Sequence, residues 1–405
     1  MEKTCAALQA ALGSDKVLFP GSDAYAAALT SYFSPQVSGL HPQCFVTPRS
    51  PRDVSCVIET MRATGGEFAI RGGGHQWFRG ATSCSGVTVD MRGLDSVVIS
   101  GDRSSVTVGA GATWDAVYET LDVLGFSAAG GRVAGVILFE VVLADGSVVE
   151  ASEQQNSDLW LALRGGCNIF GIITSLDAVD QQARVYAELM DPAKYDENAS
   201  FLFGWSFNST HKLSVALNLL IYTKPNGNEV PQVPPFTNRS PTCRQSRTLR
   251  PAPPYLSTTV TFAPTEAMIR ATFDAYNASL PSVQDIAGIS WNINLEALPP
   301  QLYALGLADR SGRLAVCLLS PAWSRAGDDD KVYAAARTLM EEINCRARDL
   351  GAHDPYIYMN YAAPGQEVIA SYGQASVAQL QHVRARVDPH GLFTHQVPGG
   401  FKIPQ

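Results

Sequence analysis

The 405-residue chain lacks several features that would point to particular classes of protein. No apolar run approaches the roughly 18 residues that a membrane-spanning helix needs, and the N-terminus lacks the apolar core of a secretory signal. Lys and Arg number 30 against 38 Asp and Glu, a net charge of −8. Since no basic excess is available to neutralise phosphates, we do not expect nucleic acid as a partner. Since no apolar run is long enough to span a bilayer, we do not expect a membrane partner.

Two further absences concern metals and cofactors. None of the eight cysteines forms a Cys-x-x-Cys pair or has metal-ligand spacing, so no metal site is predicted. Their even number permits disulfides, but spacing alone does not assign the pairs in a chain of this length. No Gly-x-Gly-x-x-Gly opens a βαβ unit with an acidic residue at the right distance, which argues against a nicotinamide-dependent enzyme.

The most informative segment that is present is Arg71-Gly72-Gly73-Gly74-His75, directly after the extended-looking run Glu67–Ile70. Consecutive glycines let backbone N–H groups approach a ligand without interference from Cβ atoms. Successive exposed N–H groups form an anion-binding concavity that suits a pyrophosphate. His75 lies at the exit of this loop, where a ring nitrogen could meet the bound group. A histidine beside such a loop is, however, more often a hydrogen-bonding spectator.

The first half of the chain has the pattern of an α/β region. From Cys44 to about Asp177, short β-branched runs are separated by glycines and interrupted by helical periodicity. The expected helices are Pro51–Thr64 and Thr113–Leu124, the second with Thr113 as its N-cap. The expected strands include Val87–Val89, Val97–Ile99, Val106–Val108, Val141–Leu143 and Ile172–Thr174.

The pattern changes from about Gln181 to Ala352, where longer strands and two long helices are expected. The strands are Phe201–Trp205, Leu213–Tyr222 and Leu314–Leu319, and the helices are Thr265–Leu280 and Asp328–Arg348. The Pro-rich and Arg/Ser-rich stretch Pro231–Pro254 has little apolar periodicity. It is either a surface loop or disordered connector, or the product of a local error in the reading frame.

In combination, these segments resemble the berberine bridge enzyme-like, vanillyl-alcohol oxidase-type FAD-linked oxidoreductases. The resemblance begins with Arg71–His75 and Gly80 and continues in the order of that family to the C-terminus. The later matches are Val87–Met91, Val108–Trp114, Val142–Ser147, Asp158–Trp160, Arg164–Gly166, Tyr358–Tyr361 and Asp388–Phe393. No single motif is unique to the family, and the shared order of the motifs is the specific signal.

The resemblance implies an α+β fold with a two-part PCMH-type FAD-binding domain and a substrate domain of antiparallel sheet backed by helices. We expect an N-terminal helical segment at 1–41, the FAD-binding domain at 42–180, the substrate domain at 181–352, and a return to the FAD-binding domain at 353–405. The residues expected to bind FAD are Arg71, Gly72, Gly73, Gly74, His75, Gly111, Ile172 and Asn360.

The resemblance also implies the chemistry, which is hydride transfer from an alcohol, sugar or secondary metabolite to FAD, with reoxidation by O2. A ring nitrogen of His75 would carry the 8α carbon of the flavin. Some members add a cysteinyl link in the stretch equivalent to Gly130–Val136, which holds no cysteine here. A single histidyl link is therefore predicted, in a protein expected to be a monomer.

Two residues are candidates for the catalytic base. Tyr361 resembles a near-flavin position, but a phenol with a pKa near 10 needs a cation or hydrogen bonds to act near neutral pH. Glu296 lies on an expected strand, where Asn292, Asn294 and Glu296 share one face. Ordinary packing of Tyr361 and ordinary exposure of Glu296 remain alternatives.

The chain departs from its family at two places. After Gly135-Val136 relatives continue with a glycine-rich strand and loop that line the flavin, whereas Val136 here runs directly into Ile137. Cys167 stands where relatives carry glycine, which would cost about 1–2 kcal/mol if φ is positive there. Two hypotheses follow: a working FAD-dependent oxidoreductase, or a non-catalytic remnant that binds FAD weakly or not at all. Many relatives are secreted, so the protein is either intracellular or continues upstream into a secretory signal.

Overall fold

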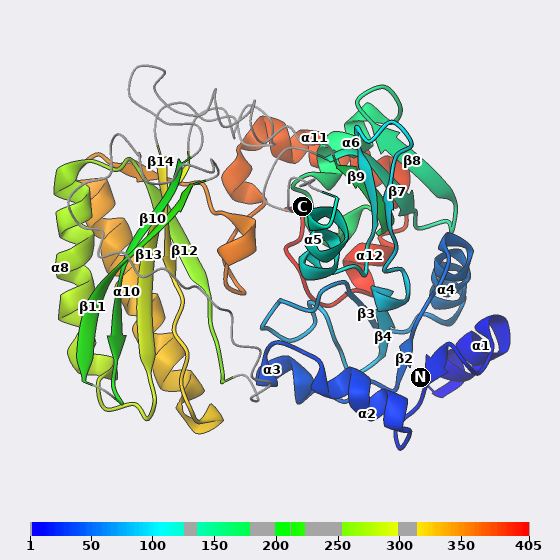
Figure 1. Ribbon diagram of the computed structural model, residues 1–405, viewed down its shortest axis with the longest axis horizontal. Coiled ribbons are helices and arrows are strands. Elements are labelled where there is room, and N and C mark those ends of the chain that lie inside the picture. Colours follow the sequence, from blue (N-terminus) through cyan, green and yellow to red (C-terminus); the bar gives the residue numbers. More distant parts are fainter. Residues whose placement is uncertain are drawn as a thin grey trace. The chain divides into compact units, whose positions relative to one another are not determined.

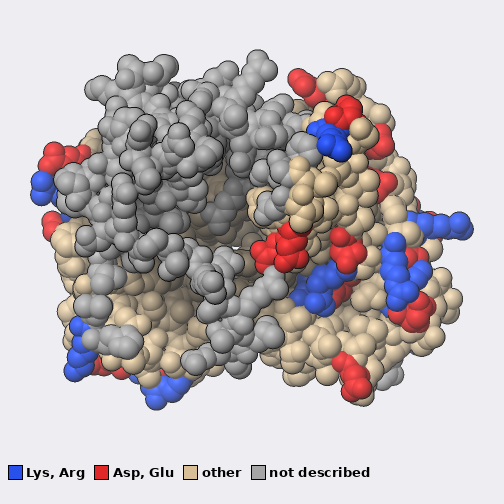
Figure 2. Space-filling view, in the orientation of Figure 1, with Lys and Arg blue, Asp and Glu red and all other residues tan. Residues whose placement is uncertain are grey.

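The computed structural model describes residues 2–124, 136–178, 199–210, 212–222, 253–298 and 314–404. These residues form two compact units (Figure 1), one within Met1–Gln182 and Pro364–Gln405 and the other within Ala183–Gln301 and Ser311–Ala363. In the described ranges, no helix is both long and apolar enough to span a membrane. Basic and acidic side chains are interspersed on the face drawn in Figure 2.

The first unit contains a four-stranded sheet in the order β1-β2-β4-β3. Strand β4 (Val87–Asp90) is parallel to both β2 (Cys44–Val46) and β3 (Phe68–Arg71), and β1 (Val17–Leu18) pairs antiparallel with β2. Parallel strands need a crossover, and helix α4 (Pro51–Thr64) provides it between β2 and β3. The helix begins at Ser50, whose side chain accepts a hydrogen bond from the backbone N–H of Asp53, and ends at Gly65 with φ 73°.

A second sheet of the same unit has five antiparallel strands in the order β5-β6-β9-β7-β8. Their bounds are β5 Val97–Ile99, β6 Val106–Gly109, β7 Val136–Val142, β8 Val148–Ser152 and β9 Ile172–Ala178. Helix α5 (Trp114–Asp122) follows β6 and begins at Thr113, whose side chain accepts from the N–H of Ala116. Helix α6 (Ser157–Leu163) follows β8.

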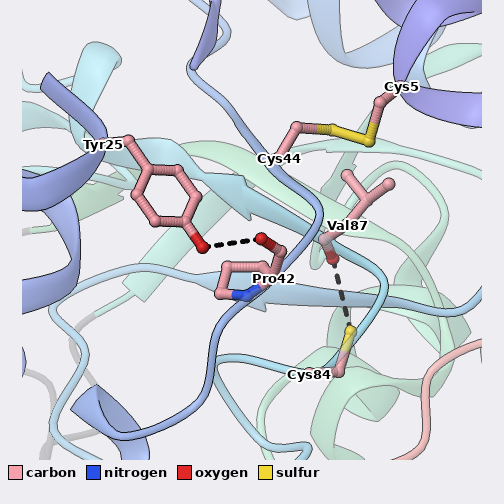
Figure 3. The surroundings of a disulfide bond; sticks show 6 residues. All are labelled: Cys5, Tyr25, Pro42, Cys44, Cys84 and Val87. Atoms are coloured by element: carbon pink, nitrogen blue, oxygen red, sulfur yellow. Dashed lines mark hydrogen bonds between the residues drawn. A yellow bond between two sulfur atoms is a disulfide. The ribbon is translucent and has the colours of Figure 1, made fainter. Parts of the chain in front are cut away.

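Both ends of the chain pack into this unit. Helices α1 (Glu2–Leu12), α2 (Asp23–Thr30) and α3 (Pro35–Ser38) precede β2, and a disulfide between Cys5 and Cys44 joins α1 to β2 (Figure 3). At the other end lie α11 (Gln374–Val387) and α12 (Leu392–His395). Phe393 of α12 is fully buried in the same core as Cys5 and the strands of the first sheet.

The second unit is an antiparallel sheet in the order β11-β10-β13-β14-β12-β15. Its strands are β10 Ala199–Asn208, β11 Leu213–Tyr222, β12 Thr258–Phe262, β13 Ser290–Leu298, β14 Leu314–Leu319 and β15 His353–Asp354. Helices α8 (Glu266–Val283) and α10 (Asp329–Asp349) lie together beside the sheet in Figure 1.

One face of β13 is turned toward α8. Tyr276 Oη of α8 donates to the carbonyl of Trp291, and Trp291 Nε1 donates to Ser279 Oγ of the same helix. Trp291, Ile293 and Leu295 are buried. Because side chains alternate along a strand, Asn292, Asn294 and Glu296 lie on the opposite face, as predicted. The α+β fold class, with an antiparallel sheet backed by helices, is confirmed.

The borders differ in detail from the sequence-based expectation. Residues 353–363 belong to the second unit, since β15 pairs with β12 there, and the return to the first unit begins at Pro364 rather than at 353. The Val136–Ile137 junction opens β7, and the pairing with β9 shifts register between Val136 and Leu138. The segments 130–135 and 231–252, both singled out in the sequence, lie outside the described residues.

Candidate functional site

The glycine loop begins where β3 ends. Arg71 pairs with Asp90 of β4, and Gly72, Gly73 and Gly74 follow at the carboxyl end of the strand. A Cβ atom on Gly73 would meet nothing within 4 Å. Gly74 has φ 70°, and a Cβ atom there would lie 2.9 Å from Nε of Arg71. The loop thus exposes backbone at Gly73, while Gly74 is fixed by its conformation and by the side chain beneath it.

The Arg71 side chain points into the protein and not toward a ligand. It is 1% exposed. Its guanidinium donates to the carbonyl oxygens of Ala28 at 2.9 Å and Ser31 at 2.8 Å and lies 3.8 Å from the ring centroid of Tyr32. The backbone of Arg71, and not its side chain, is therefore the part that can contribute to the cradle predicted at Arg71–Gly74. Its side chain supports the loop from below.

A buried carboxylate balances this guanidinium. Asp90 Oδ2 lies 3.6 Å from Arg71 Nη1 and 2.6 Å from Arg92 Nη2. Burial lowers the pKa of Arg71, and the neighbouring Asp90 opposes that shift. The hydrogen bond to Asp90 raises the pKa of Arg92. The two ion pairs with Asp90 offset part of the cost of removing these groups from water.

His75 is exposed at the exit of the loop. Its imidazole stacks on the ring of Phe33, with centroids 4.4 Å apart and planes 15° from parallel. Stacking covers a face of the imidazole and leaves the nitrogen-bearing edge in the plane of the ring. A nucleophilic ring nitrogen needs that edge, so the arrangement suits bond formation at His75.

Gly111 and Ile172, both predicted to bind the cofactor, lie near the loop but present no side chain to it. The N–H of Ala110 donates to the carbonyl of Thr174 on β9, and a Cβ on Gly72 would lie 3.3 Å from the carbonyl oxygen of Ala110. A Cβ on Gly111 would overlap the carbonyl oxygen of Met91, and Ile172 is 1% exposed in the apolar core. Close packing accounts for both residue types, and any role in binding falls to their backbone.

In the second unit, the two candidate bases meet. Tyr361 Oη donates a hydrogen bond of 2.8 Å to Oε2 of Glu296. Tyr361 is 8% exposed and ends a short 3-10 helix, η4 (Met359–Tyr361). Glu296 lies on the central strand β13, on the face turned away from Trp291 and α8. A phenol bonded to a carboxylate is suited to passing on a proton.

Asn360, predicted at the flavin edge, takes part in the same cluster. It is exposed, and its Nδ2 donates to Oη of Tyr358 at 2.9 Å. The rings of Tyr358 and Tyr361 meet edge to face with centroids 5.0 Å apart. The motif Tyr358–Tyr361 thus supplies a group of hydroxyl and amide donors rather than a single polar residue.

The Cys167 substitution occupies a strained position. Cys167 has φ 62°, the left-handed region in which glycine is favoured. The N–H of Phe401 donates to its sulfur at 3.4 Å, and the neighbouring Asn168 donates to the carbonyl of Gly399. The sequence analysis assigns a cost to a side chain at position 167 if φ is positive there, and φ is positive. The C-terminal segment holds the substituted residue in place.

The residues present fit FAD in the first unit. Gly73 provides open backbone for a pyrophosphate, and His75 next to it is exposed. The segment 125–135, which includes Gly130–Gly135, lies outside the described residues. Within the described part of the chain, no three His, Cys, Asp or Glu side chains form a group that could hold a metal ion.

Sequence reasoning missed the supports of the loop. The connector Ser31–Ser34 between α2 and α3 contacts it, as does the Asp90–Arg92 pair. A charged residue directly after the apolar run Val87–Val89 was a usable signal for Asp90, because strand ends carry functional side chains. No local signal marked the connector, or paired Cys5 with Cys44.

The chain is similar to known flavoproteins in sequence and in fold. A family model described as FAD binding domain matches residues 42–137. The FAD-dependent monooxygenase CTB5 of Cercospora beticola is 30% identical over 485 residues, which cover 99% of this chain and 92% of that protein. Oligopeptidase PhomG' of Diaporthe leptostromiformis is 36% identical over 451 residues, 98% of this chain but 37% of that protein. The chain therefore spans little more than a third of the second relative.

The two sequence alignments also concern the gap that the sequence predicts after Val136. Both alignments are longer than the 405-residue chain, so the two relatives carry residues that this chain lacks. The FAD-binding match ends at residue 137, next to the Val136–Ile137 junction at which the sequence predicts a gap.

Solved structures share the fold. The 6-hydroxy-D-nicotine oxidase of Arthrobacter nicotinovorans matches with a TM-score of 0.74 at 16% identity, covering 96% of this chain and 97% of that one. The glucooligosaccharide oxidase of Acremonium strictum, described with a 6-S-cysteinyl, 8α-N1-histidyl FAD, matches with a TM-score of 0.70 at 17% identity, covering 95% and 97%.

Proposed function

Because the chain belongs to the FAD-linked oxidoreductases of the berberine bridge enzyme-like, vanillyl-alcohol oxidase type, we propose that it oxidises a small organic substrate with FAD joined to His75. The observation that carries the proposal is the exposed His75 imidazole at the exit of an open glycine loop. The glucooligosaccharide oxidase with a histidyl FAD supports it by analogy of fold.

Bound FAD would supply a two-electron acceptor for hydride and a means of passing the electrons to O2. The chain's own residues have separate tasks. The backbone at Gly72 and Gly73 would hold the pyrophosphate, and His75 would anchor the ring system. The ion pairs of Asp90 with Arg71 and Arg92 lie beneath the loop and would stabilise its conformation.

Tyr361 and Glu296 would remove the substrate proton together. When a substrate hydroxyl gives its proton to Tyr361 Oη, the phenol proton can pass along the existing 2.8 Å hydrogen bond to Glu296. Glu296 is then the base, and Tyr361 is the group that touches the substrate. This division of roles removes the need for a tyrosinate at neutral pH, which the sequence alone left as the difficulty.

The substrate class is an alcohol, a sugar or a secondary metabolite. A second candidate reaction is insertion of one oxygen atom, because the relative that covers 99% of this chain is named a monooxygenase. The two are separated by the fate of O2. An oxidase releases one H2O2 for each substrate oxidised, whereas a monooxygenase places one atom of ¹⁸O2 in its product.

The Cys5–Cys44 disulfide supports an oxidising compartment for the protein. We therefore propose a secretory location over an intracellular one. Mass spectrometry of the protein isolated from its native source without reduction tests this location. A Cys5–Cys44 linked peptide supports it, and alkylated Cys5 and Cys44 contradict it.

The test of function starts with the purified protein and its variants. We expect yellow protein whose flavin colour stays with the polypeptide after acid precipitation, and loss of that acid-stable colour in His75→Ala. The matched control is His382→Ala, an exposed histidine on α11 of the same unit, which should keep it. Colourless wild-type protein with no FAD affinity would favour the non-catalytic remnant instead.

A further inference from the structure

Each residue of the connector Ser31–Ser34, between α2 and α3, contacts the segment Arg71–Thr82, which contains the glycine loop. The carbonyl oxygen and Oγ of Ser31 accept hydrogen bonds from Arg71 Nη2 at 2.8 and 3.0 Å. Tyr32 Oη donates to the carbonyl of Thr82 at 2.9 Å, and Phe33 stacks on His75. Ser34 Oγ donates to the carbonyl of Trp77 at 3.2 Å. The connector therefore contacts the loop before, at and after the histidine.

Two of these contacts lie in the protein interior. Ser34 is fully buried and Tyr32 is 7% exposed, and the Tyr32 ring also packs against the Arg71 guanidinium. A buried hydrogen bond to a backbone carbonyl holds that segment in one place, since breaking it leaves an unsatisfied polar group. Trp77 and Thr82, both downstream of His75, are thus held by the same connector that holds Arg71 upstream.

Phe33 differs from its neighbours because it is 37% exposed. Its ring lies parallel to the imidazole of His75, so it contacts the residue proposed to carry the flavin. The parallel stack at 4.4 Å restricts rotation of the imidazole about its Cβ–Cγ bond. The phenyl ring covers a face of the imidazole and not its nitrogen-bearing edge.

We propose that Ser31–Ser34 is a clamp and that Phe33 is a positioning residue, which holds the His75 imidazole in the orientation needed for its bond to the flavin. This inference rests on the His75 link of the proposed function. Forming that link joins a ring nitrogen to the 8α methyl carbon and removes one hydrogen from each. The two electrons and two protons are taken up by O2 as H2O2. Restricting the ring lowers the entropic barrier to this step.

The test compares Phe33→Ala with Phe33→Tyr, which keeps the stack, and with Phe273→Ala. Phe273 is the matched control, since it is 39% exposed and packs on Trp205 in the other unit. Apoprotein from riboflavin-starved cells is mixed with saturating FAD in air, and acid-stable flavin is followed over time. FAD affinity is measured separately without O2, so that the link cannot form.

We expect the link to form about three- to tenfold more slowly in Phe33→Ala, the range that loss of one aromatic pair predicts. FAD affinity should stay within about twofold of wild type, and Phe33→Tyr and Phe273→Ala should behave as wild type. Formation of the link at the wild-type rate in Phe33→Ala overturns the proposal. So does a slower rate that only follows weaker FAD binding.

A second measurement separates this proposal from the proposed function. If wild-type protein forms no acid-stable flavin, the His75 link is refuted. The clamp is then tested by whether Phe33 restricts the His75 imidazole in the apoprotein. Nuclear magnetic relaxation of the His75 ring in the apoprotein should then show a more mobile imidazole in Phe33→Ala than in wild type or Phe273→Ala. Equal ring mobility in all three proteins overturns the clamp.

Discussion

The phenol of Tyr361 donates a 2.8 Å hydrogen bond to the carboxylate of Glu296. The two residues come from different elements of the second unit, η4 and the central strand β13. Each had been singled out in the sequence for a separate reason, as an alternative to the other. Their contact makes them one proton-accepting pair.

The pair predicts non-additive kinetics. Tyr361→Phe and Glu296→Gln should each lower kcat by about 10²–10⁴-fold, the usual contribution of a general base. The double variant should be about as slow as the slower single variant, because both changes interrupt the same proton path. Rates would be measured by H2O2 release with the compound that a screen of alcohols, sugars and phenols identifies. Effects that multiply in the double variant would show two independent roles.

The glycine loop predicts opposite outcomes at two neighbouring positions. Gly74→Ala should lose about 1–2 kcal/mol of unfolding free energy, because φ is 70° and the new methyl group meets Arg71. Gly73→Ala should change stability by less than about 0.5 kcal/mol, since nothing lies within 4 Å, but weaken FAD binding. Urea unfolding of the apoprotein and FAD titration measure the two effects. Equal destabilisation at both positions would contradict the loop geometry.

The left-handed conformation of Cys167 predicts that glycine is preferred there. Cys167→Gly should be about 1 kcal/mol more stable than Cys167→Ala. Neither variant carries the sulfur, so loss of its contacts does not affect the comparison. Cys345, in the interior of α10, is the control. Cys345→Ala should be about 1 kcal/mol more stable than Cys345→Gly, because glycine is unfavourable within a helix. The same order at both sites would argue against strain at Cys167.

The disulfide predicts a stability effect confined to its two cysteines. Bridging residues separated by 39 positions should contribute roughly 4 kcal/mol through the entropy of the unfolded chain. Cys5→Ala should therefore lower the urea midpoint, and a reductant should lower that of wild type but not that of the variant. Cys56→Ala, a free cysteine on α4, is the control. If Cys5→Ala unfolds like Cys56→Ala, the bridge adds nothing to stability.

Elements with strong local signals could be predicted from the sequence almost to the residue. Helix α4 was predicted and found at Pro51–Thr64, because Ser50 caps its start and Gly65 ends it in a left-handed conformation. Strands β11 and β14 also have their predicted bounds, Leu213–Tyr222 and Leu314–Leu319. The family's motifs then gave the fold class, which comparison confirms.

Long-range relationships could not be predicted in the same way. The sequence predicts Arg71 in the cradle but does not show where its side chain lies. The side chain is buried against Ala28 and Ser31, about forty positions earlier in the chain. No local pattern reports such a contact. The pairing of Tyr361 with Glu296 across 65 positions is of the same kind, since only the folded sheet brings them together.

The central claim is that His75 carries the flavin, and peptide mass spectrometry tests it most directly. The purified protein is digested under acid conditions, and the peptide containing His75 is sequenced by fragmentation. The account predicts that this peptide bears the mass of FAD, or of its hydrolysis product, on the histidine in the wild type and in His382→Ala. An unmodified His75 peptide from yellow, FAD-containing protein would contradict it.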